Sequence, residues 1–273
     1  MSDDDGAPSD ARRRRFLRGA VAVCGLALGA GRAHAQGTPD AQGVIEASDR
    51  VRNPGVPFSV RNTLIEYRSG VENDSMAFLV MAKESPETRQ FLNVLRYIEP
   101  PRDRGKIILS NGKSMWFYDP ASKSSVRISP QERLFGQAAN GDVIIVNFAR
   151  DYNARSIVSD TVNDAQKTRR DCWKIDMVAA NEAATYARVE YWVEKTTDYP
   201  VKSRCYADSG RLLKVAFYRR FQEEMGRIRP TEVVIVDAVN SNLVTIMHFS
   251  DYRARKLPDE WFQREYLPRL RSD

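Results

Sequence analysis

Few residues of this sequence are of the types that carry enzyme chemistry. Histidine occurs only at His34 and His248 among 273 residues, which excludes a metal site built from several histidines. His248 could act as the base of a Ser–His–Asp arrangement, but it lies in a strand-like run, and we interpret it as a structural histidine. The sequence has no Gly-rich phosphate loop and no HExxH, CxxC or GxSxG motif. We therefore predict neither a metal nor a cofactor.

Carboxylates are numerous, 36 in all, but their spacing singles out no acid/base pair. A glycosidase-type pair stays open, because strands bring distant residues together. A hydrolase acting on an envelope polymer is accordingly one alternative, and it would need a polar cleft with a perturbed carboxylate. We predict that the protein is not an enzyme.

The first 35 residues have the order of an export signal. A basic run, RRRRFLR at 12–18, precedes an apolar stretch rich in Ala and Gly at 19–31, and the small-x-small pattern AHA ends at Ala35. We therefore predict a signal peptide over 1–35, cleaved after Ala35, and a periplasmic location. The string RRRFLR resembles a twin-arginine signal, and a general secretory signal with additional arginines is the alternative.

The predicted location bears on the roles of the three cysteines. Cys24 in the signal could be a lipoprotein anchor, but Val23 stands where a lipobox has a small residue. In an exported protein, Cys172 and Cys205 predict a disulfide. Two buried, unpaired thiols are the alternative, because the expected strands of the two cysteines have another strand between them and a disulfide needs Cα atoms within about 7 Å.

The charge of the chain argues against nucleic acid as a partner. The formal net charge is only +6, and the basic residues beyond the signal are scattered rather than clustered in a stripe. Weak attraction to anionic lipid headgroups is compatible with this surplus.

The elements that would position a site are mostly strands. Residues 36–43 read as a flexible leader, and a short helix is expected over 44–51, before Pro54 and Pro57. Period-two alternation then predicts strands over 59–68, 75–83, 90–98, 106–110, 114–118, 124–128, 172–178, 187–194, 201–206, 212–221, 231–237 and 243–252.

A break in this alternation covers residues 130–152. Leu134, Phe135 and Ala138 lie at helical spacing, and Asn140-Gly141 predicts a stop. We expect two short helices there, the second over 143–152, in a helix–turn–helix pair. Another helix, packed on the sheet, is expected after Pro258.

Short turns join the predicted strands. Asn111-Gly112 is a strong hairpin signal, and Asp208-Ser209-Gly210 predicts a tight turn. Consecutive strands with short turns predict an antiparallel meander that curls into a barrel or half-barrel.

Several of these strands are apolar on both faces. Met76 and Phe78 share one face of their strand, as do Trp116 and Tyr118. Two-sided burial indicates either helices over one side of the sheet or a cavity lined by side chains. An ordinary filled core is built from the same residue types, so both interpretations stay open.

One string carries a resemblance to a known family. SNGKSMWFYDPASKSSVRIS, at 110–129, resembles the hairpin of LolA-type periplasmic lipoprotein carriers in its Gly112, Trp116, Tyr118, Asp119, Pro120 and Val126. The flanking PPRDRGKIIL and RISPQERLFGQAANGDV resemble the outer membrane lipoprotein-sorting relatives of LolA and LolB. DRVRNP, YPVKSRCYADSGRLLK and MHFSDYRARKLPDEWF are similar to them more loosely.

This resemblance implies a fold and a function. The fold is mainly β with a helical lid: a strongly curved antiparallel sheet forming an incomplete, half-open β-barrel covered by short α-helices, with a single carrier domain over 44–273. The function is a periplasmic carrier of lipid or lipoprotein acyl chains between inner and outer membrane. We expect a monomer with transient membrane contact, served by an inner-membrane transporter. The alternative is a non-enzymatic accessory subunit of an envelope lipid transporter with a filled core. The expected cavity and lid residues are Met76, Phe78, Trp116, Tyr118, Leu134, Phe135, Tyr191 and Phe217.

Overall fold

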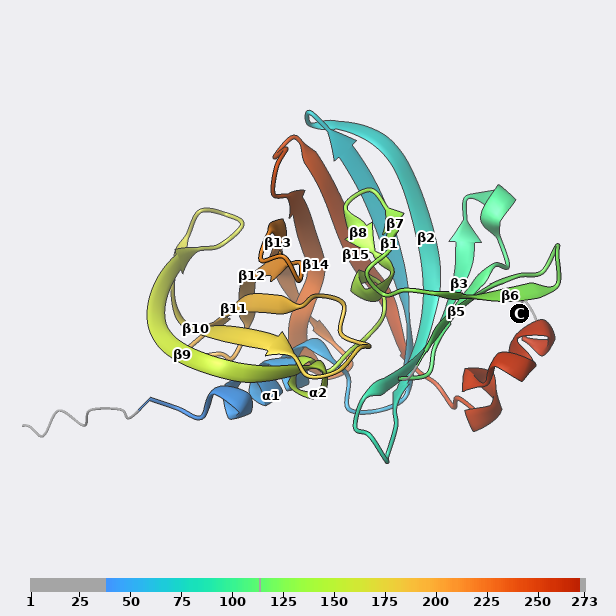
Figure 1. The fold of residues 1–273 in the computed structure, drawn as a ribbon, viewed down its shortest axis with the longest axis horizontal. Helices are drawn as coiled ribbons and strands as arrows, with labels where there is room; N and C mark the ends of the chain where they lie inside the picture. The colour runs from blue at the N-terminus through green and yellow to red at the C-terminus, as the bar shows by residue number, and fades with distance from the viewer. Residues whose placement is uncertain (1–37, 113, 271–273) are drawn as a thin grey trace, which may run out of the picture. The chain divides into compact units, whose positions relative to one another are not determined.

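In the computed structural model, which describes residues 38–112 and 114–270, strands dominate (Figure 1). The main antiparallel sheet contains β1 (Phe58–Arg68), β2 (Val71–Glu84), β3 (Phe91–Glu99), β4 (Ile107–Ser110), β5 (Met115–Asp119), β6 (Ser124–Ile128), β9 (Tyr152–Asn163), β10 (Arg169–Ala179), β11 (Arg188–Glu194), β12 (Pro200–Tyr206), β13 (Leu212–Glu224), β14 (Arg227–Asp237) and β15 (Leu243–Ala254). The remaining elements are two helices, α1 (Ala41–Arg52) and α2 (Phe148–Asp151), a small hairpin, β7 (Arg133–Phe135) and β8 (Ala138–Ala139), and the 3₁₀ turns η1 (Pro101–Asp103), η2 (Asn140–Asp142), η3 (Asp259–Phe262) and η4 (Arg264–Arg269).

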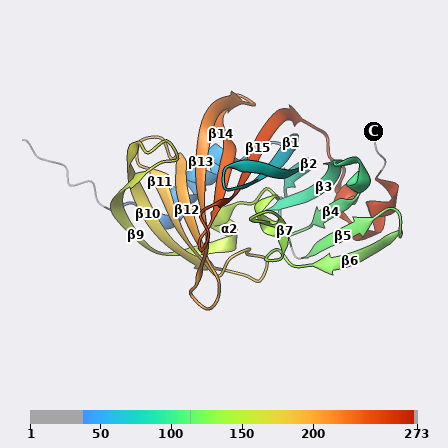
Figure 2. The same ribbon diagram turned by 90° about the horizontal axis from the view of Figure 1, so that it is seen from above.

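The strand order of the main sheet is β6-β5-β4-β3-β2-β1-β15-β14-β13-β12-β11-β10-β9. Two meanders of consecutive strands are therefore joined where β1 pairs with β15, with Leu64 opposite Met247. Figure 2 shows the strands side by side, from β9 at one edge to β6 at the other. Since β6 and β9 do not pair, the strongly curved sheet stays an incomplete barrel, as the sequence predicts.

The chain passes from edge strand β6 to edge strand β9 across the inside of this curve. Residues 129–151, here called the crossing segment, contain β7, β8, η2 and α2 and lie with α1 on the inner face of the sheet (Figure 1). Gly136 in this segment has a φ of +52°, and a side chain there would collide with the Thr245 hydroxyl on β15. Only glycine therefore allows this close approach.

Helix α1 is defined at both ends and anchored inside. The Asp40 side chain accepts a hydrogen bond from the Gly43 N–H at its start (2.9 Å), and Pro54 follows its end. Ile45 is fully buried in the inner core. The Gln42 side chain donates to the carbonyl of Ala149 (2.9 Å), which joins α1 to the end of the crossing segment.

The outer face of β2 to β5 is covered as well. Met81 and Leu109 of these strands form a separate apolar cluster with Phe262 of η3 and Leu267 of η4. The two-sided apolar pattern thus has a simple cause, because the inner face packs on the crossing segment and α1, and this outer part packs on the C-terminal turns.

The predicted helix–turn–helix pair and the predicted C-terminal helix are wrong, and one strand was missed. The helix–turn–helix pair over 130–152 is replaced by β7, β8, η2 and a four-residue α2, because Gly136 turns the chain back and Gly141 donates to the Pro130 carbonyl (2.9 Å). Strand β9 was missed: as an edge strand it is exposed along most of its length and shows little apolar alternation. The C-terminal helix is a pair of 3₁₀ turns. The predictions for residues 1–35 lie outside the described residues.

Candidate functional site

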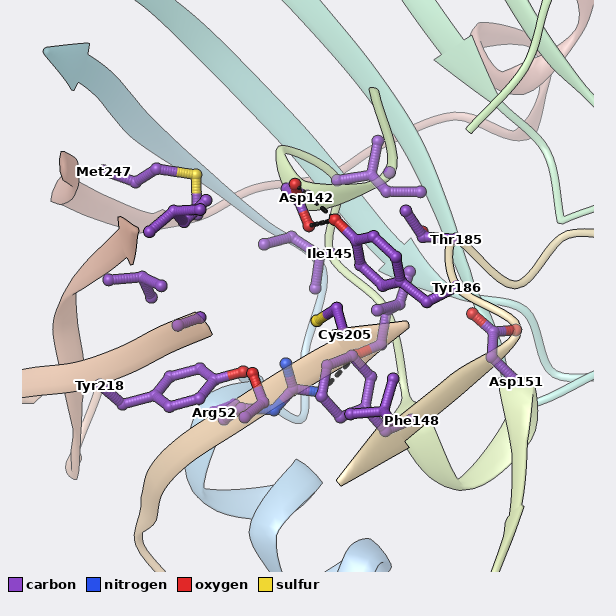
Figure 3. A pocket seen from close by; sticks show the side chains of 18 of the residues that line it. Arg52, Asp142, Ile145, Phe148, Asp151, Thr185, Tyr186, Cys205, Tyr218 and Met247 are labelled. Atoms are coloured by element: carbon purple, nitrogen blue, oxygen red, sulfur yellow. Dashed lines mark hydrogen bonds between the residues drawn. The ribbon is translucent and has the colours of Figure 1, made fainter. Parts of the chain in front are cut away.

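A cavity of about 110 Å³ lies between the inner face of the sheet and the crossing segment (Figure 3). Alternation along the strands sends Cys205 of β12, Tyr218 of β13 and Met247 of β15 into it. Ile145 and Phe148 of the crossing segment lie across from these walls. The cavity is therefore a gap between the curved sheet and one continuous stretch of chain.

Two side-chain amides, Gln90 just before β3 and Asn93 within it, hold the part of the crossing segment that covers the cavity. Asn93 donates to the Ile145 carbonyl (2.9 Å) and accepts from the Ile145 N–H (2.8 Å). Gln90 does the same with Asn147, donating to its carbonyl (3.2 Å) and accepting from its N–H (2.8 Å). These pairs imitate an antiparallel strand ladder, but one partner in each is a side chain. In the described ranges, no backbone hydrogen bond joins residues 143–149 to the sheet.

The end of α1 holds the same stretch from the other side. Arg52 donates to the Val146 carbonyl (3.0 Å) and to Asp49 (2.6 Å), and its guanidinium lies 3.9 Å from the centre of the Phe148 ring. Asn53 also donates to the Val146 carbonyl (2.9 Å) and to the Asn147 side chain (2.8 Å). Burial raises the pKa of Asp49, and the positive charge of Arg52 opposes that rise. The pair places a charged group directly in the cavity wall.

A second buried polar group fastens the crossing segment nearer β7 and β8. Lys214 of β13 donates to Asp142 (2.8 Å) and to the Gln137 carbonyl (2.6 Å). The Tyr186 hydroxyl donates to the same carboxylate at 2.6 Å (Figure 3). Burial raises the pKa of Tyr186 well above its ordinary value, and so does the neighbouring Asp142. Lys214 and Asp142 thus form a buried ion pair, in which removal of one partner would leave the other charge without compensation.

The size and lining of the cavity define what it can do. An apolar cavity of about 150 Å³ holds one benzene molecule, so the present volume is too small for an acyl chain unless the crossing segment moves. In the described part of the chain, no three His, Cys, Asp or Glu side chains are arranged to hold a metal ion. Nor is any described helix long and apolar enough to cross a membrane.

Five of the predicted cavity and lid residues lie on the inner side of the sheet, although the cavity lining does not include them. Phe78, Phe135 and Tyr191 are buried in the inner core, and Met76 and Leu134 pack against it. The Tyr191 ring lies 5.4 Å from Phe148 and 6.2 Å from Tyr218, centre to centre, directly behind the cavity wall.

The other three lie on the outer face, which corrects their assignment to the cavity. Trp116 and Tyr118 belong to the cluster beneath η3 and η4. Phe217 lies between Ala216 and Tyr218, whose side chains face the cavity, so its own side chain points outward. Period-two alternation correctly assigned residues of a strand to the same face, but it could not show which face of the sheet is the inner one.

The predicted disulfide is also corrected. Cys172 and Cys205 are both free and buried. Cys205 faces the inner cavity, whereas Cys172 lies in an outer cluster with Trp192, and β11 separates their strands. Burial raises the pKa of each thiol to about 12.

The residues that hold the crossing segment were missed by sequence reasoning. A signal existed, however: Asn93 interrupts the inward apolar series of β3 between Phe91 and Leu95, and Lys214 interrupts that of β13 before Ala216. A polar residue at an inward position needs a buried partner, and each has one on the crossing segment.

The fold and its covered cavity define a class of half-open antiparallel barrels with an internal cavity. A family model whose description reads "Uncharacterized protein" matches residues 88–269. No curated protein matches the chain. The crystal structure of a LolA superfamily protein from Nitrosomonas europaea is 30% identical, covers 84% of this chain and 100% of its own, and superposes with a TM-score of 0.74. The chain belongs to the LolA superfamily.

Two further solved structures share the fold. A domain from Vibrio parahaemolyticus, provisionally described as an outer membrane lipoprotein-sorting protein, is 16% identical over 84% of this chain and 100% of its own, with a TM-score of 0.68. A DUF1329 family protein from Desulfovibrio piger is 20% identical over 83% of this chain and 97% of its own, with a TM-score of 0.67.

Proposed function

We propose that the protein is a non-enzymatic periplasmic carrier that encloses the acyl chains of lipids or lipoproteins between the sheet and the crossing segment. The observation that carries this proposal is the attachment of residues 144–148. This stretch covers an apolar inner face but is held by side chains rather than by a strand ladder, so it can leave while the sheet stays intact.

The free energy that holds the crossing segment in place is comparable with the free energy gained by burying an acyl chain. Seven hydrogen bonds join residues 145–147 to the side chains of Arg52, Asn53, Gln90 and Asn93. At about 1 kcal/mol each they contribute roughly 7 kcal/mol. An acyl chain that buries about fourteen methylenes at about 0.8 kcal/mol each contributes roughly 11 kcal/mol. Burial of one chain can therefore offset displacement of the crossing segment.

Membership in the LolA superfamily and the description of the Vibrio parahaemolyticus domain support the cargo class. We extend the proposal to transient membrane contact, action as a monomer, and an inner-membrane transporter as the donor. The export signal predicted from the sequence supports the periplasmic location.

A second candidate follows from the small cavity. With only about 110 Å³ free, the same fold could serve with a filled core as an accessory subunit of an envelope lipid transporter. Mass spectrometry of organic extracts from protein purified without detergent separates the two. We expect stoichiometric lipid, or uptake of added lipid by the lipid-free protein. A folded sample that does neither would eliminate the carrier and leave the accessory subunit.

A further inference from the structure

A second groove lies on the outer face of the sheet, opposite the inner cavity. The β9–β10 hairpin (residues 161–169) and the outer faces of β12, β13 and β14 line an open groove of about 670 Å³. This is within the roughly 300–1,000 Å³ typical of small-molecule sites. We call it the outer groove.

The floor of the outer groove is apolar. Phe217, Val234 and Val236 line it and are only partly buried. The row continues through strand pairing, because Val234 pairs with Ile246 of β15, which in turn pairs with Ile65 of β1. The water-facing side of an antiparallel sheet is normally polar, and C-terminal turns cover the apolar outer face only over β2 to β5. This apolar row therefore requires an explanation other than packing within the described chain.

Cations without carboxylate partners surround this floor. Lys167, Arg169 and Lys202 line the groove, and no described Asp or Glu lies within ion-pair distance of them. Arg219 is paired with Glu232, and Asp164 is taken up by Arg170 (2.9 Å). Burial lowers the pKa of Lys202, as does nearby Arg204. The uncompensated charge of the groove is thus positive.

The floor strands exclude an added peptide strand. β12, β13 and β14 are paired on both sides, so their backbone groups are occupied. A ligand must bind through apolar contact and charge, which is the chemistry of an anionic amphiphile. We propose that the outer groove binds one anionic phospholipid molecule, with its phosphate among Lys167, Arg169 and Lys202 and the start of an acyl chain on Phe217 and Val234.

Isothermal titration with soluble short-chain lipids tests this proposal. Monomeric dihexanoylphosphatidylglycerol should bind the purified protein at least about tenfold more tightly than the zwitterionic dihexanoylphosphatidylcholine, since removing each surface cation contact costs about fivefold. Lys202→Gln and, separately, the exposed Arg169→Gln should each weaken binding about fivefold. Lys256→Gln, an exposed lysine outside the groove, is the matched control and should change affinity less than about twofold.

Three results would overturn the proposal: equal affinity for the two lipids, equal losses in the control and groove variants, or inorganic phosphate alone binding as tightly as the lipid. The last would show that the apolar floor takes no part. Because Lys202 and Phe217 point away from the inner cavity, uptake of a long-chain zwitterionic phosphatidylcholine, which the outer groove should bind weakly, should be the same in Lys202→Gln. Failure of the outer groove and failure of the carrier function are therefore distinguishable.

Discussion

Two buried asparagines on the inner face offer a direct test of how the crossing segment is held. Asn93 on β3 and Asn62 on β1 are both fully buried. Asn93 exchanges two hydrogen bonds with the backbone of Ile145, whereas neither amide atom of Asn62 has a partner among the described residues. The same substitution to leucine should therefore have opposite consequences at the two positions.

Asn93→Leu removes the pairing of Ile145 and leaves its N–H and carbonyl unpaired, which should destabilise the closed arrangement by about 2 kcal/mol. If lipid binds only after residues 144–148 move, that change lowers the opening cost, and the apparent affinity for a fluorescent fatty acid should rise about 30-fold. Hydrogen exchange should speed up at residues 145–148 and remain unchanged in β13 and β14.

Asn62→Leu is the matched control. It removes an unsatisfied buried amide, so urea unfolding should show a gain of about 1 kcal/mol, while exchange at 145–148 stays as in the parent. Faster exchange at 145–148 in Asn93→Leu without tighter fatty-acid binding would refute the idea that displacement of this stretch limits binding. A loss of stability in Asn62→Leu would show that its amide is satisfied.

Three further predictions concern the same inner face. Gly136→Ala should destabilise by roughly 2–3 kcal/mol through its φ and its collision with Thr245, whereas Gly210→Ala, also at positive φ but with open space, should cost only about 1 kcal/mol in urea unfolding. Lys214→Met should lower the free energy of unfolding by about 3–5 kcal/mol because it leaves the buried Asp142 without its cation. Adding Asp142→Leu should restore most of that stability in a double-mutant cycle. The Cys205 thiol should resist a thiol reagent in the native protein at pH 8, because burial raises its pKa from 9.0 to about 12. For the same reason the free energy of unfolding should fall as the pH rises above about 9, and Cys205→Ala should weaken that fall.

Alternation and turn chemistry predicted most of the sheet because those signals are local. The helix over 44–51 and the twelve predicted strands all correspond to observed elements. The prediction for the crossing segment failed because the signals that determine its structure are not local. Its conformation comes from distant partners, such as Asn93 for Ile145 and Thr245 for the turn at Gly136, so helical spacing of Leu134 and Phe135 had no bearing on it.

The predicted cavity residues show a different limit. Period two assigns residues to faces correctly, yet an isolated strand has no inner or outer side. Trp116 and Phe217 were therefore predicted to line the cavity together with Phe78, although the curvature of the sheet places them on the opposite face. Curvature is a property of all thirteen strands together, which no single strand reveals.

Polar residues at inward positions carry the information that apolar ones lack. A filled core and a cavity for acyl chains use the same aliphatic and aromatic side chains, so Val233 or Ile235 cannot distinguish them. A core that never opens has no use for Asn93 or Lys214, because apolar residues of similar volume at such sites are often as stabilising as a buried ion pair. Their presence makes sense where a segment must be held firmly and still be released, since hydrogen bonds lost to the segment can be regained from water. Asn93 and Lys214, rather than the number of apolar residues, therefore favour the carrier over the filled core.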